Sequence, residues 1–307
     1  MTRIVAGDET SRAYTAIVVA MVSISFAPIL VKWCDSTPFV ITFYRLFFAC
    51  AMLLPFVAWN RGFSELRSLP GREWVLILVS ATALAFHFGL WIASLSLTLV
   101  ATSVVLVTAH PMFVAGVSHF VLGERVRRIA AVGIVVAFLG VCVISAADLQ
   151  LGGTNMTGNT LAFLGGICAG IYLLSGRRAR QKVSLGTYVF TVYLICAAML
   201  FVAAVVVGDV ITVSSHRELS LFILLAIVPT IFGHTMFNFA LKTLPAHIVS
   251  TSLLAEPIGA SVLAYFLLPD EMPGRWIVIG SILVIGGLYI VLMKGLQEKT
   301  PCEARTP

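Results

Sequence analysis

HFGLWIASL (residues 87–95) and GHTMFNFAL (residues 233–241) are two short stretches, each inside a long apolar run. In each stretch a histidine is followed four residues later by a second side chain that can form hydrogen bonds, Trp91 in the first and Asn238 in the second. Residues four apart share one face of an α-helix. The recurrence of this pattern suggests a chain built from two related halves, each with a polar helix face.

The whole chain is strongly apolar. Of its 307 residues, 59% are hydrophobic and only 11% are charged, and its mean hydropathy is +1.01. A soluble domain has roughly 25% charged residues, so this chain has too little polar surface for the two soluble domains that its length would allow. The composition therefore indicates a protein whose main solvent is lipid.

Ten apolar runs divide the chain, each close to the roughly 20 residues that a helix needs to cross a bilayer. A membrane β-barrel would instead show segments of about ten residues with alternating hydrophobicity, whereas these runs are continuously apolar. We therefore expect an all-α polytopic membrane protein with ten transmembrane helices, the first of them retained rather than cleaved as a signal peptide. The helices are expected near residues 14–33, 38–59, 74–96, 99–121, 128–147, 158–176, 186–208, 219–241, 246–268 and 275–294.

The Lys and Arg residues set the expected orientation. If the N-terminus is cytoplasmic, sixteen of the twenty fall on the cytoplasmic side, Arg45 lies inside a run, and only Lys32, Arg217 and Arg275 fall on the opposite side. Such an excess in cytoplasmic loops is typical of multi-pass membrane proteins. We therefore expect a cell (cytoplasmic or inner) membrane protein with both termini in the cytoplasm. The net charge of +6 reflects this orientation, and no nucleic-acid partner is expected.

A shift of 147 residues superposes the first stretch on the second. The same shift superposes Gly133 on Gly280 and Gly140 on Gly287. Each half holds five runs, and because five is odd, the second half enters the membrane from the opposite side. Two inverted copies are an architecture of secondary transporters, with the substrate site near the middle of the membrane.

The expected organisation is therefore two inverted five-helix repeats. The first covers residues 1–147 and the second residues 158–294. An extracytoplasmic connector at 148–157 joins them, and a cytoplasmic tail follows at 295–307.

Several motifs occur in order along the chain: SISFAPILVK, FYRLFFA, HFGLWIASL, TSVVLVTAHP followed by LGER, GHTMFNFAL, LLAEP and LLPDE. With these motifs the chain resembles EamA-type transporters of the drug/metabolite transporter superfamily over approximately residues 14–294. The resemblance implies ten helices in two inverted five-helix repeats and a role as an exporter of small organic solutes. The LLPDE segment departs from the family pattern, in which Gly more often precedes Glu.

Few ionisable side chains lie inside the runs, and intramembrane ionisable residues are functional-site candidates. His87 with Trp91 and His234 with Asn238 are predicted to line one central cavity and bind substrate; packing between helices is the alternative. Tyr44 and Arg45 are added as candidate substrate-binding residues. The bidentate guanidinium of Arg45 suits a carboxylate or phosphate, although its side chain could instead reach toward a helix end.

Glu256-Pro257 and His110-Pro111 form a second candidate set, because they occupy equivalent positions in the two halves. Proline removes a helix hydrogen bond, so both helices are expected to bend, and the pair is predicted to act in gating. A buried Glu256 can carry a proton during transport. The alternative is that Glu256 pairs with Arg45 or a histidine and fastens the halves together.

Other sites are not expected. There is no H-E-x-x-H motif and no His/Cys pair with ligand spacing, so no metal site is predicted. The six cysteines form no C-x-x-C pair and are interpreted as packing residues. Neither a cofactor nor catalytic residues can be assigned.

The predicted function is a secondary transporter, an exporter of small organic metabolites such as amino acids or amines by alternating access. There is no nucleotide-binding G-x-x-x-x-G-K-[ST] loop, so a gradient, for example of protons, is the expected driving force. A membrane-embedded enzyme that uses His87, His234 and Glu256 is the alternative, and a channel is a third. The expected partners are the lipid bilayer and a small-molecule substrate, with the protein as monomer or homodimer.

Overall fold

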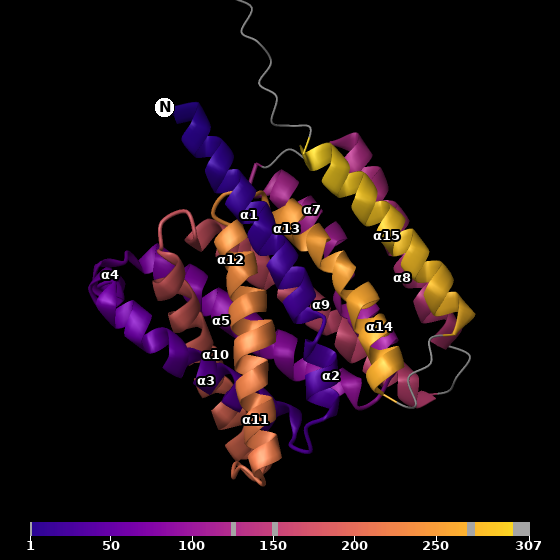
Figure 1. The fold of residues 1–307 in the computed structure, drawn as a ribbon, viewed down its shortest axis with the longest axis horizontal. Helices are drawn as coiled ribbons and strands as arrows, with labels where there is room; N and C mark the ends of the chain where they lie inside the picture. The colour runs from indigo at the N-terminus through magenta and orange to yellow at the C-terminus, as the bar shows by residue number, and fades with distance from the viewer. Residues whose placement is uncertain (1, 124–126, 149–152, 269–273, 297–307) are drawn as a thin grey trace, which may run out of the picture.

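The computed structural model describes residues 2–123, 127–148, 153–268 and 274–296, which form a bundle of helices (Figure 1). No β-strand occurs within these ranges. The all-α class that the continuous apolar runs predicted is therefore confirmed.

The helices follow the predicted apolar runs, although α1 begins earlier than expected and several runs are interrupted. Residues 149–152 of the predicted connector and 297–307 of the predicted tail lie outside the described residues. In chain order the helices are α1 (Thr2–Ile24), α2 (Ala27–Lys32), α3 (Pro38–Trp59), α4 (Gly62–Ser68), α5 (Gly71–Leu95), α6 (Val100–Val107), α7 (Pro111–Phe120), α8 (Arg128–Asp148), α9 (Gly153–Ala179), α10 (Leu185–Val207), α11 (His216–Leu225), the π-helix η1 (Ala226–Thr235), α12 (Met236–Ala240), α13 (Ala246–Ser252), the 3-10 helix η2 (Leu253–Ala255), α14 (Glu256–Leu267) and α15 (Arg275–Leu296).

Within the described residues, 7 helical stretches are long and apolar enough to cross a membrane. The other three predicted runs are also helical but give shorter apolar helices. A break separates α6 from α7, and the apolar described parts of α8 and α15 are Arg128–Gly140 and Val278–Val291. The chain is thus a multi-pass membrane protein, whereas the count of ten spans stays a prediction.

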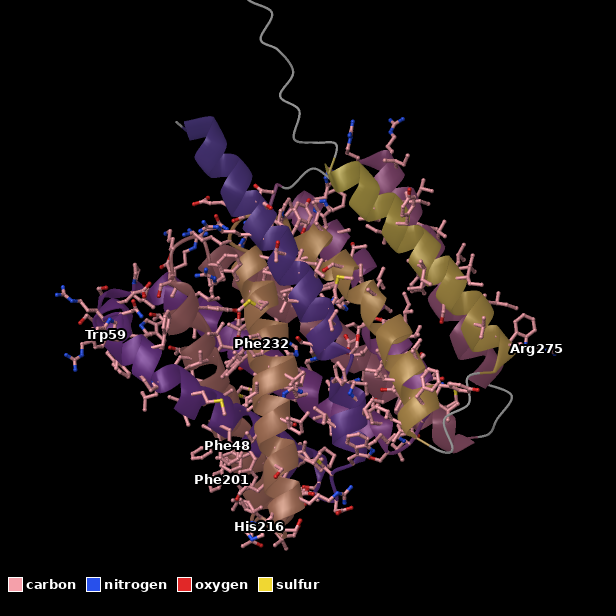
Figure 2. The ribbon with its side chains drawn as sticks, in the orientation of Figure 1. Phe48, Trp59, Phe201, His216, Phe232 and Arg275 are labelled. Atoms are coloured by element: carbon pink, nitrogen blue, oxygen red, sulfur yellow. The ribbon has the colours of Figure 1, made fainter. Side chains whose placement is uncertain are left out.

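The outside of the bundle carries many exposed apolar side chains, as a lipid-facing surface requires (Figure 2). Phe232 is 48% exposed and Phe201 is 40% exposed. Trp59 ends α3 with 89% of its surface exposed, and tryptophan is enriched where a membrane helix meets water.

Two of the predicted spans are interrupted at equivalent points. α6 ends at Val107 and α7 begins with Pro111, while α13 passes through η2 into α14, whose second residue is Pro257. Proline is well placed in the first turn of a helix because its missing N–H would have no partner there. A new short helix therefore starts at Pro111 in the first case and one residue before Pro257 in the second.

Glycines bring α8 and α15 together as an antiparallel pair. A Cβ at Gly133 would lie 2.7 Å from the carbonyl oxygen of Gly287, and a Cβ at Gly140 would lie 2.5 Å from that of Gly280. Such distances leave no room for any side chain. In the sequence repeat Gly133 is equivalent to Gly280, and Gly140 is equivalent to Gly287. The two contacts, Gly133 with Gly287 and Gly140 with Gly280, are therefore related by the symmetry of the repeat.

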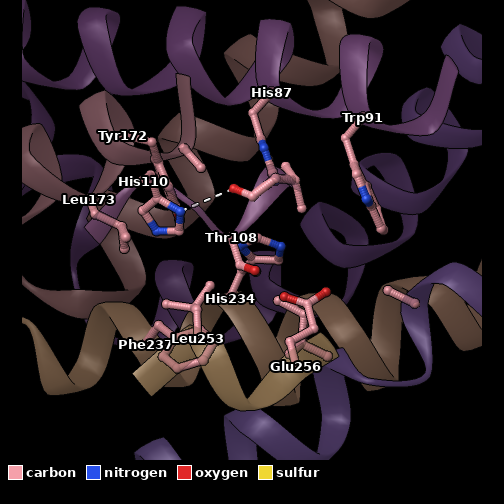
Figure 3. Close-up of a pocket in the computed structure, with 14 residues that line it drawn as sticks. His87, Trp91, Thr108, His110, Tyr172, Leu173, His234, Phe237, Leu253 and Glu256 are labelled. Carbon is pink, nitrogen blue, oxygen red and sulfur yellow. Dashed lines mark hydrogen bonds between the residues drawn. The ribbon is translucent and has the colours of Figure 1, made fainter. Parts of the chain in front are cut away.

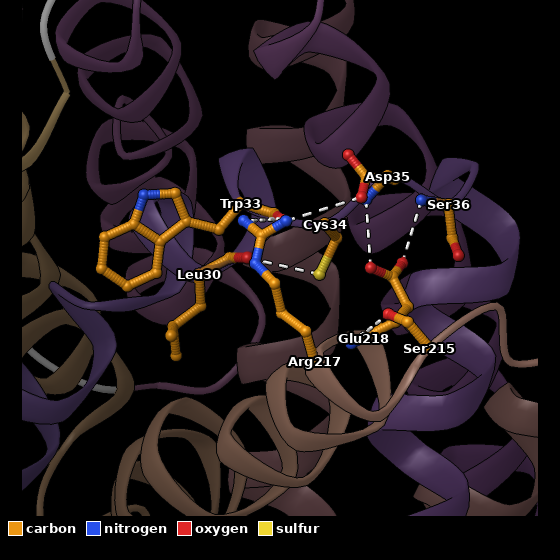
Figure 4. A network of polar contacts seen from close by, with 8 residues as sticks. All are labelled: Leu30, Trp33, Cys34, Asp35, Ser36, Ser215, Arg217 and Glu218. Carbon is orange, nitrogen blue, oxygen red and sulfur yellow. Dashed lines mark hydrogen bonds and ion pairs between the residues drawn. The ribbon is translucent and has the colours of Figure 1, made fainter.

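A buried glutamate joins the two halves at the end of the bundle that contains the loop between α2 and α3 (Figure 4). Glu218, the third residue of α11, is fully buried. Its carboxylate accepts hydrogen bonds from the backbone N–H of Asp35 at 3.2 Å and of Ser36 at 3.0 Å. The backbone N–H of Glu218 donates in turn to the Ser215 hydroxyl at 3.1 Å, which caps α11. One side chain thus fixes the loop before α3 to the start of α11.

A second glutamate makes the equivalent connection at the opposite end of α3. Glu73 is the third residue of α5 and is 3% exposed, and its Oε1 lies 2.8 Å from Nζ of Lys182 in the turn before α10. Close by, Glu65 of α4 accepts hydrogen bonds from the backbone N–H of Ser184 at 2.7 Å and from the hydroxyl of Thr187 at 2.5 Å. Polar contacts therefore join the two halves of the chain at both ends of the bundle.

Candidate functional site

A small cavity lies inside the bundle between the two halves (Figure 3). Its volume is about 30 Å³, and a water molecule needs roughly 10–15 Å³ on this measure. The cavity therefore has room for about two waters, and a metabolite would fit only after the surrounding helices move apart. The polar or aromatic side chains in its wall are His87, Trp91, Thr108, His110, Tyr172, His234, Phe237 and Glu256.

Three of the four residues from the two opening stretches meet in this cavity. The rings of His87 and Trp91, on one face of α5, are nearly parallel with centroids 6.1 Å apart. The ring of His234, from η1, lies 6.1 Å from that of His87. These contacts join the two halves of the chain at one point, as the central-cavity hypothesis requires.

Asn238 does not line the cavity. Its side-chain amide donates to the hydroxyl of Tyr172 and, at 2.7 Å, to the carbonyl oxygen of His234. Tyr172 itself lies in the cavity wall. The structure therefore differs from the predicted direct contact: Asn238 holds Tyr172, whose ring lies 6.2 Å from that of His234, and Tyr172 rather than Asn238 lines the cavity.

Glycines of α9 allow that helix to approach the cavity closely. His87 Nδ1 donates to the carbonyl oxygen of Gly165 at 3.0 Å. At the next residue, a Cβ on Gly166 would lie 2.4 Å from the carbonyl oxygen of Val107, so only glycine fits. The G-x-x-x-G of this run, Gly166 to Gly170, contacts α6 and α7 inside the fold.

The π-helix η1 was not predicted. It contains Pro229, which cannot donate a backbone hydrogen bond. The hydroxyl of Thr230 donates to the carbonyl oxygen of Leu225, five residues earlier, at 2.7 Å. π-Helical segments inside α-helices are frequent at functional sites, and His234, the second-last residue of this one, lines the cavity.

Arg45 lies behind the cavity wall and is fully buried. Its Nε donates to the Thr230 hydroxyl at 2.6 Å, and its guanidinium lies over the ring of Phe88, 4.3 Å from the centroid. Both Nη atoms lack a hydrogen-bond partner, and no carboxylate of the described residues is within ion-pair distance. The alternative that Arg45 reaches toward a helix end does not fit this burial.

Tyr44 points elsewhere. Its hydroxyl donates to the carbonyl oxygen of Ile211, in the loop between α10 and α11, at 2.5 Å, and its ring stacks on Phe222 with centroids 4.9 Å apart. Neighbouring residues of a helix point about 100° apart, so Tyr44 and Arg45 cannot both face the interior. Tyr44 fastens α3 to that loop and does not line the cavity.

His110 and Glu256 both line the cavity, each at the start of a broken helix. His110 Nδ1 donates to the carbonyl oxygen of Val107 at 3.1 Å. In Figure 3 the Glu256 carboxylate points into the cavity from the side opposite His87 and Trp91. Pro111 and Pro257 set the helix starts without lining the cavity themselves.

Several polar atoms around the cavity are buried without a hydrogen-bond partner: Trp91 Nε1, His110 Nε2, Asn238 Oδ1 and both Nη atoms of Arg45. Leaving a buried donor or acceptor unpaired costs about 1–3 kcal/mol. Atoms of this kind pair with ordered water or with the polar groups of a ligand.

Sequence reasoning missed Tyr172 and the two fastening glutamates. A shift of 147 aligns Tyr172 with Ser25, and because the residues differ, the repeat gave no signal for it. The glutamates did leave a signal: Arg-Glu occurs at the start of both helices, as Arg72-Glu73 and Arg217-Glu218.

The described residues contain no group of three or more His, Cys, Asp or Glu side chains that could hold a metal ion. The polar groups of the cavity come from several helices and comprise ring nitrogens, hydroxyls and one carboxyl group. They suit hydrogen bonding to an organic solute.

Known proteins resemble this chain over most of its length. A transporter of Archaeoglobus fulgidus that is described as uncharacterized is 24% identical over 277 residues, which is 89% of this chain and 94% of the relative. The threonine/homoserine exporter RhtA of Escherichia coli is 26% identical over 247 residues, 79% of this chain and 78% of the exporter. A solved crystal structure with 18% identity has a TM-score of 0.70 and covers 96% of this chain and 99% of that one, so the fold is shared.

The family comparison matches both halves separately. The EamA-like transporter family profile matches residues 11–146 and again residues 156–293. Two matches in tandem agree with the internal repeat, and together they cover nearly all of the described helices. The chain belongs to the EamA-like transporter family.

Proposed function

We propose that this protein is a secondary transporter that exports small organic solutes, such as amino acids or amines, across the cytoplasmic membrane by alternating access. The observation that carries the proposal is the cavity between the halves, with its unpaired Trp91 Nε1 and His110 Nε2. The threonine/homoserine exporter among its relatives supports a solute of this size and polarity.

The proposed architecture is ten transmembrane helices in two inverted five-helix repeats, at residues 1–147 and 158–294. The antiparallel contact of α8 and α15 supports the inversion, because equivalent helices of inverted repeats run in opposite directions. The excess of Lys and Arg at one side supports cytoplasmic termini and an extracytoplasmic connector.

In the proposed site, His87, Trp91 and His234 contact the solute directly. Asn238 acts through Tyr172, to which it donates a hydrogen bond. Arg45 meets the solute, through a carboxylate or phosphate, when the cavity widens past Phe88; its two unpaired Nη atoms support this role.

The helix breaks at His110-Pro111 and Glu256-Pro257 are proposed as gates. Each joins a short helix to another within one span, so one half of the span can tilt while the other stays packed. Glu256, which faces the cavity, is proposed to carry the coupling proton, since the chain has no nucleotide-binding loop to use ATP. The working unit is proposed to be a monomer or homodimer.

A membrane-embedded enzyme that uses His87, His234 and Glu256 is the second candidate. It would need an activated nucleophile or a metal, and among the described residues His87 is instead held by a backbone carbonyl through Nδ1. No observation favours this function over transport.

Counterflow in proteoliposomes tests the proposal. Vesicles that contain the purified protein, preloaded with one member of a metabolite panel, should accumulate the same labelled metabolite transiently and with saturation. Uptake that stays linear with concentration would indicate a channel, and conversion of a solute into a product would indicate an enzyme. Either result would overturn the proposal.

A further inference from the structure

Hydrogen bonds to backbone carbonyl groups fix the ring tautomer of two histidines of the cavity. His87 Nδ1 lies 3.0 Å from the carbonyl oxygen of Gly165, and His110 Nδ1 lies 3.1 Å from that of Val107. A carbonyl oxygen can only accept a hydrogen bond, so Nδ1 carries the hydrogen in both rings. In a neutral imidazole the other nitrogen is then an acceptor.

Both rings are best described as neutral. Arg45 already places one buried cation behind Phe88 without a carboxylate partner among the described residues, and a buried charge is costly unless it is paired. His87 and His110 thus each direct a lone pair on Nε2 away from the backbone carbonyl that holds the ring. For His110 this atom is buried and has no partner.

The remaining polar groups add to this excess of acceptors. The Glu256 carboxyl group faces the cavity, and when a bound cation pairs with it, it is an ionised carboxylate that only accepts hydrogen bonds. The hydroxyl of Thr108 donates to the carbonyl oxygens of Val104 and Val105, so toward the cavity it can only accept. The donors are fewer: Trp91 Nε1–H, which is unpaired, the hydroxyl hydrogen of Tyr172, and one N–H of the His234 ring, which brings an acceptor as well.

The rest of the wall is aromatic. Trp91, Tyr172 and Phe237 line the cavity, and the faces of aromatic rings attract cations. A site with lone pairs, one carboxylate and aromatic faces matches a group that has several N–H donors and a positive charge. A carboxylate or phosphate placed there would instead face lone pairs and Glu256.

We propose that this cavity binds the protonated amino group of the solute, between Glu256 and the Nε2 atoms of His87 and His110. This assignment rests on the proposed transport function and narrows its substrate class to amines and amino acids with a free amino group. The cavity volume of about 30 Å³ accommodates an ammonium group, which is close to water in size, while the body of the solute occupies the space that opens when the helices part.

Matched solutes test the assignment. The probes are the common amino acids, their decarboxylated amines, the N-acetyl derivative of each amino acid, and the 2-hydroxy acids in which a hydroxyl replaces the amino group. Counterflow of free amines and amino acids, with loss of about tenfold or more in apparent affinity on acetylation or replacement, is the expected result, since hydrogen bonds to a charged group are worth about 1.5–3 kcal/mol.

Equal counterflow of the N-acetyl or hydroxy compounds would overturn the ammonium site while leaving the transport function standing. Absence of saturable counterflow for every probe would overturn the transport function and the ammonium site with it. The two failures are therefore distinguishable.

Substitutions test whether the preference for a free amino group arises in the cavity. Glu256→Gln should weaken binding of a transported amine about tenfold or more and leave binding of its N-acetyl derivative little changed. Glu9→Gln neutralises an exposed carboxylate of α1 and should leave both affinities as in the wild type. An equal loss for the amine and its N-acetyl derivative in Glu256→Gln would show a structural effect and contradict the proposal.

Discussion

Glu73 and Glu218 occupy the same position in the two repeats: each is the third residue of its helix and each binds the segment before α10 or α3 of the other repeat. In the described conformation both contacts are made at once, at opposite ends of α3. The cavity between them has a volume of about 30 Å³. Under the proposed alternating access this conformation corresponds to an occluded state, and opening to either side would break the contact at that side.

Removal of the Glu218 carboxylate should destabilise the protein. Glu218→Ala leaves the backbone N–H groups of Asp35 and Ser36 without their acceptor, so the loss should be about 1–3 kcal/mol. Asp35→Asn is the matched control: it removes only the exposed ion pair with Arg217, whose atoms are 3.6 Å apart, and should cost about 0–1 kcal/mol. Thermal unfolding in detergent measures both. An equal effect of the two substitutions would show that Glu218 does not fasten this end.

The helices and the repeat were predictable because both depend on local composition. Apolar runs of bilayer length and the 147-residue shift are visible without any tertiary information, and the breaks before Pro111 and Pro257 follow from the missing N–H of proline. His87 and Trp91 share a face because α5 is a regular α-helix, and their shared place in the cavity wall follows from that spacing.

The other contacts of the candidate site could not be predicted, because they depend on tertiary structure that residue spacing does not encode. The apolar pattern does not reveal the π-helix η1, and the side-chain amide of Asn238 donates to Tyr172 and to the carbonyl oxygen of His234 instead of facing the cavity. Arg45 is held by Thr230 inside that π-helix, a contact between distant segments. The role of Tyr172 depends on Gly165 and Gly166, which allow α9 to approach α5 and α6 closely; single glycines in apolar sequence do not reveal which helix they contact.

The antiparallel contact of α8 and α15 should not tolerate a methyl group. A Cβ at Gly287 would lie 2.3 Å from the carbonyl oxygen of Gly133, whereas a Cβ at its neighbour Gly286 meets nothing within 4 Å. Gly287→Ala should therefore cost about 1–3 kcal/mol of stability, while Gly286→Ala should be neutral or slightly stabilising because alanine favours helix. Thermal unfolding of the two variants side by side checks this; equal stability would mean that the helices do not touch here.

Glu65 should stabilise the fold in a pH-dependent way. Burial raises the pKa of its carboxyl, but hydrogen bonds from Ser184 and Thr187 outweigh burial and bring the pKa below the ordinary value of 4.5. A lowered pKa in the folded state means that the stabilisation is present above the unfolded-state pKa and disappears as the pH falls through the folded-state pKa. Glu65→Gln should therefore lower the unfolding temperature at neutral pH, and its difference from the wild type should shrink below pH 4.5. A difference that is constant with pH would contradict this role of the charge.

The orientation can be tested with two exposed serines. Ser68 ends α4 and Ser214 lies in the loop between α10 and α11, and the charge asymmetry predicts that they face the cytoplasm and the outside respectively. In a background without reactive native cysteines, Ser214→Cys in intact cells should react with a membrane-impermeant maleimide, and Ser68→Cys should react only after the cells are opened. The reverse pattern would invert the predicted topology.

The central claim is that the transported solute binds in the cavity lined by both repeats. Equilibrium binding of a transported solute to purified Trp91→Ala and His234→Ala tests it most directly, since these residues come from different halves. Trp59→Ala and Phe232→Ala are matched controls, because both side chains are exposed, at 89% and 48%, and Phe232 lies on the same π-helix as His234. Both cavity variants should lose about tenfold or more in affinity, and both controls should bind as the wild type does. Wild-type affinity in Trp91→Ala and His234→Ala would contradict the account.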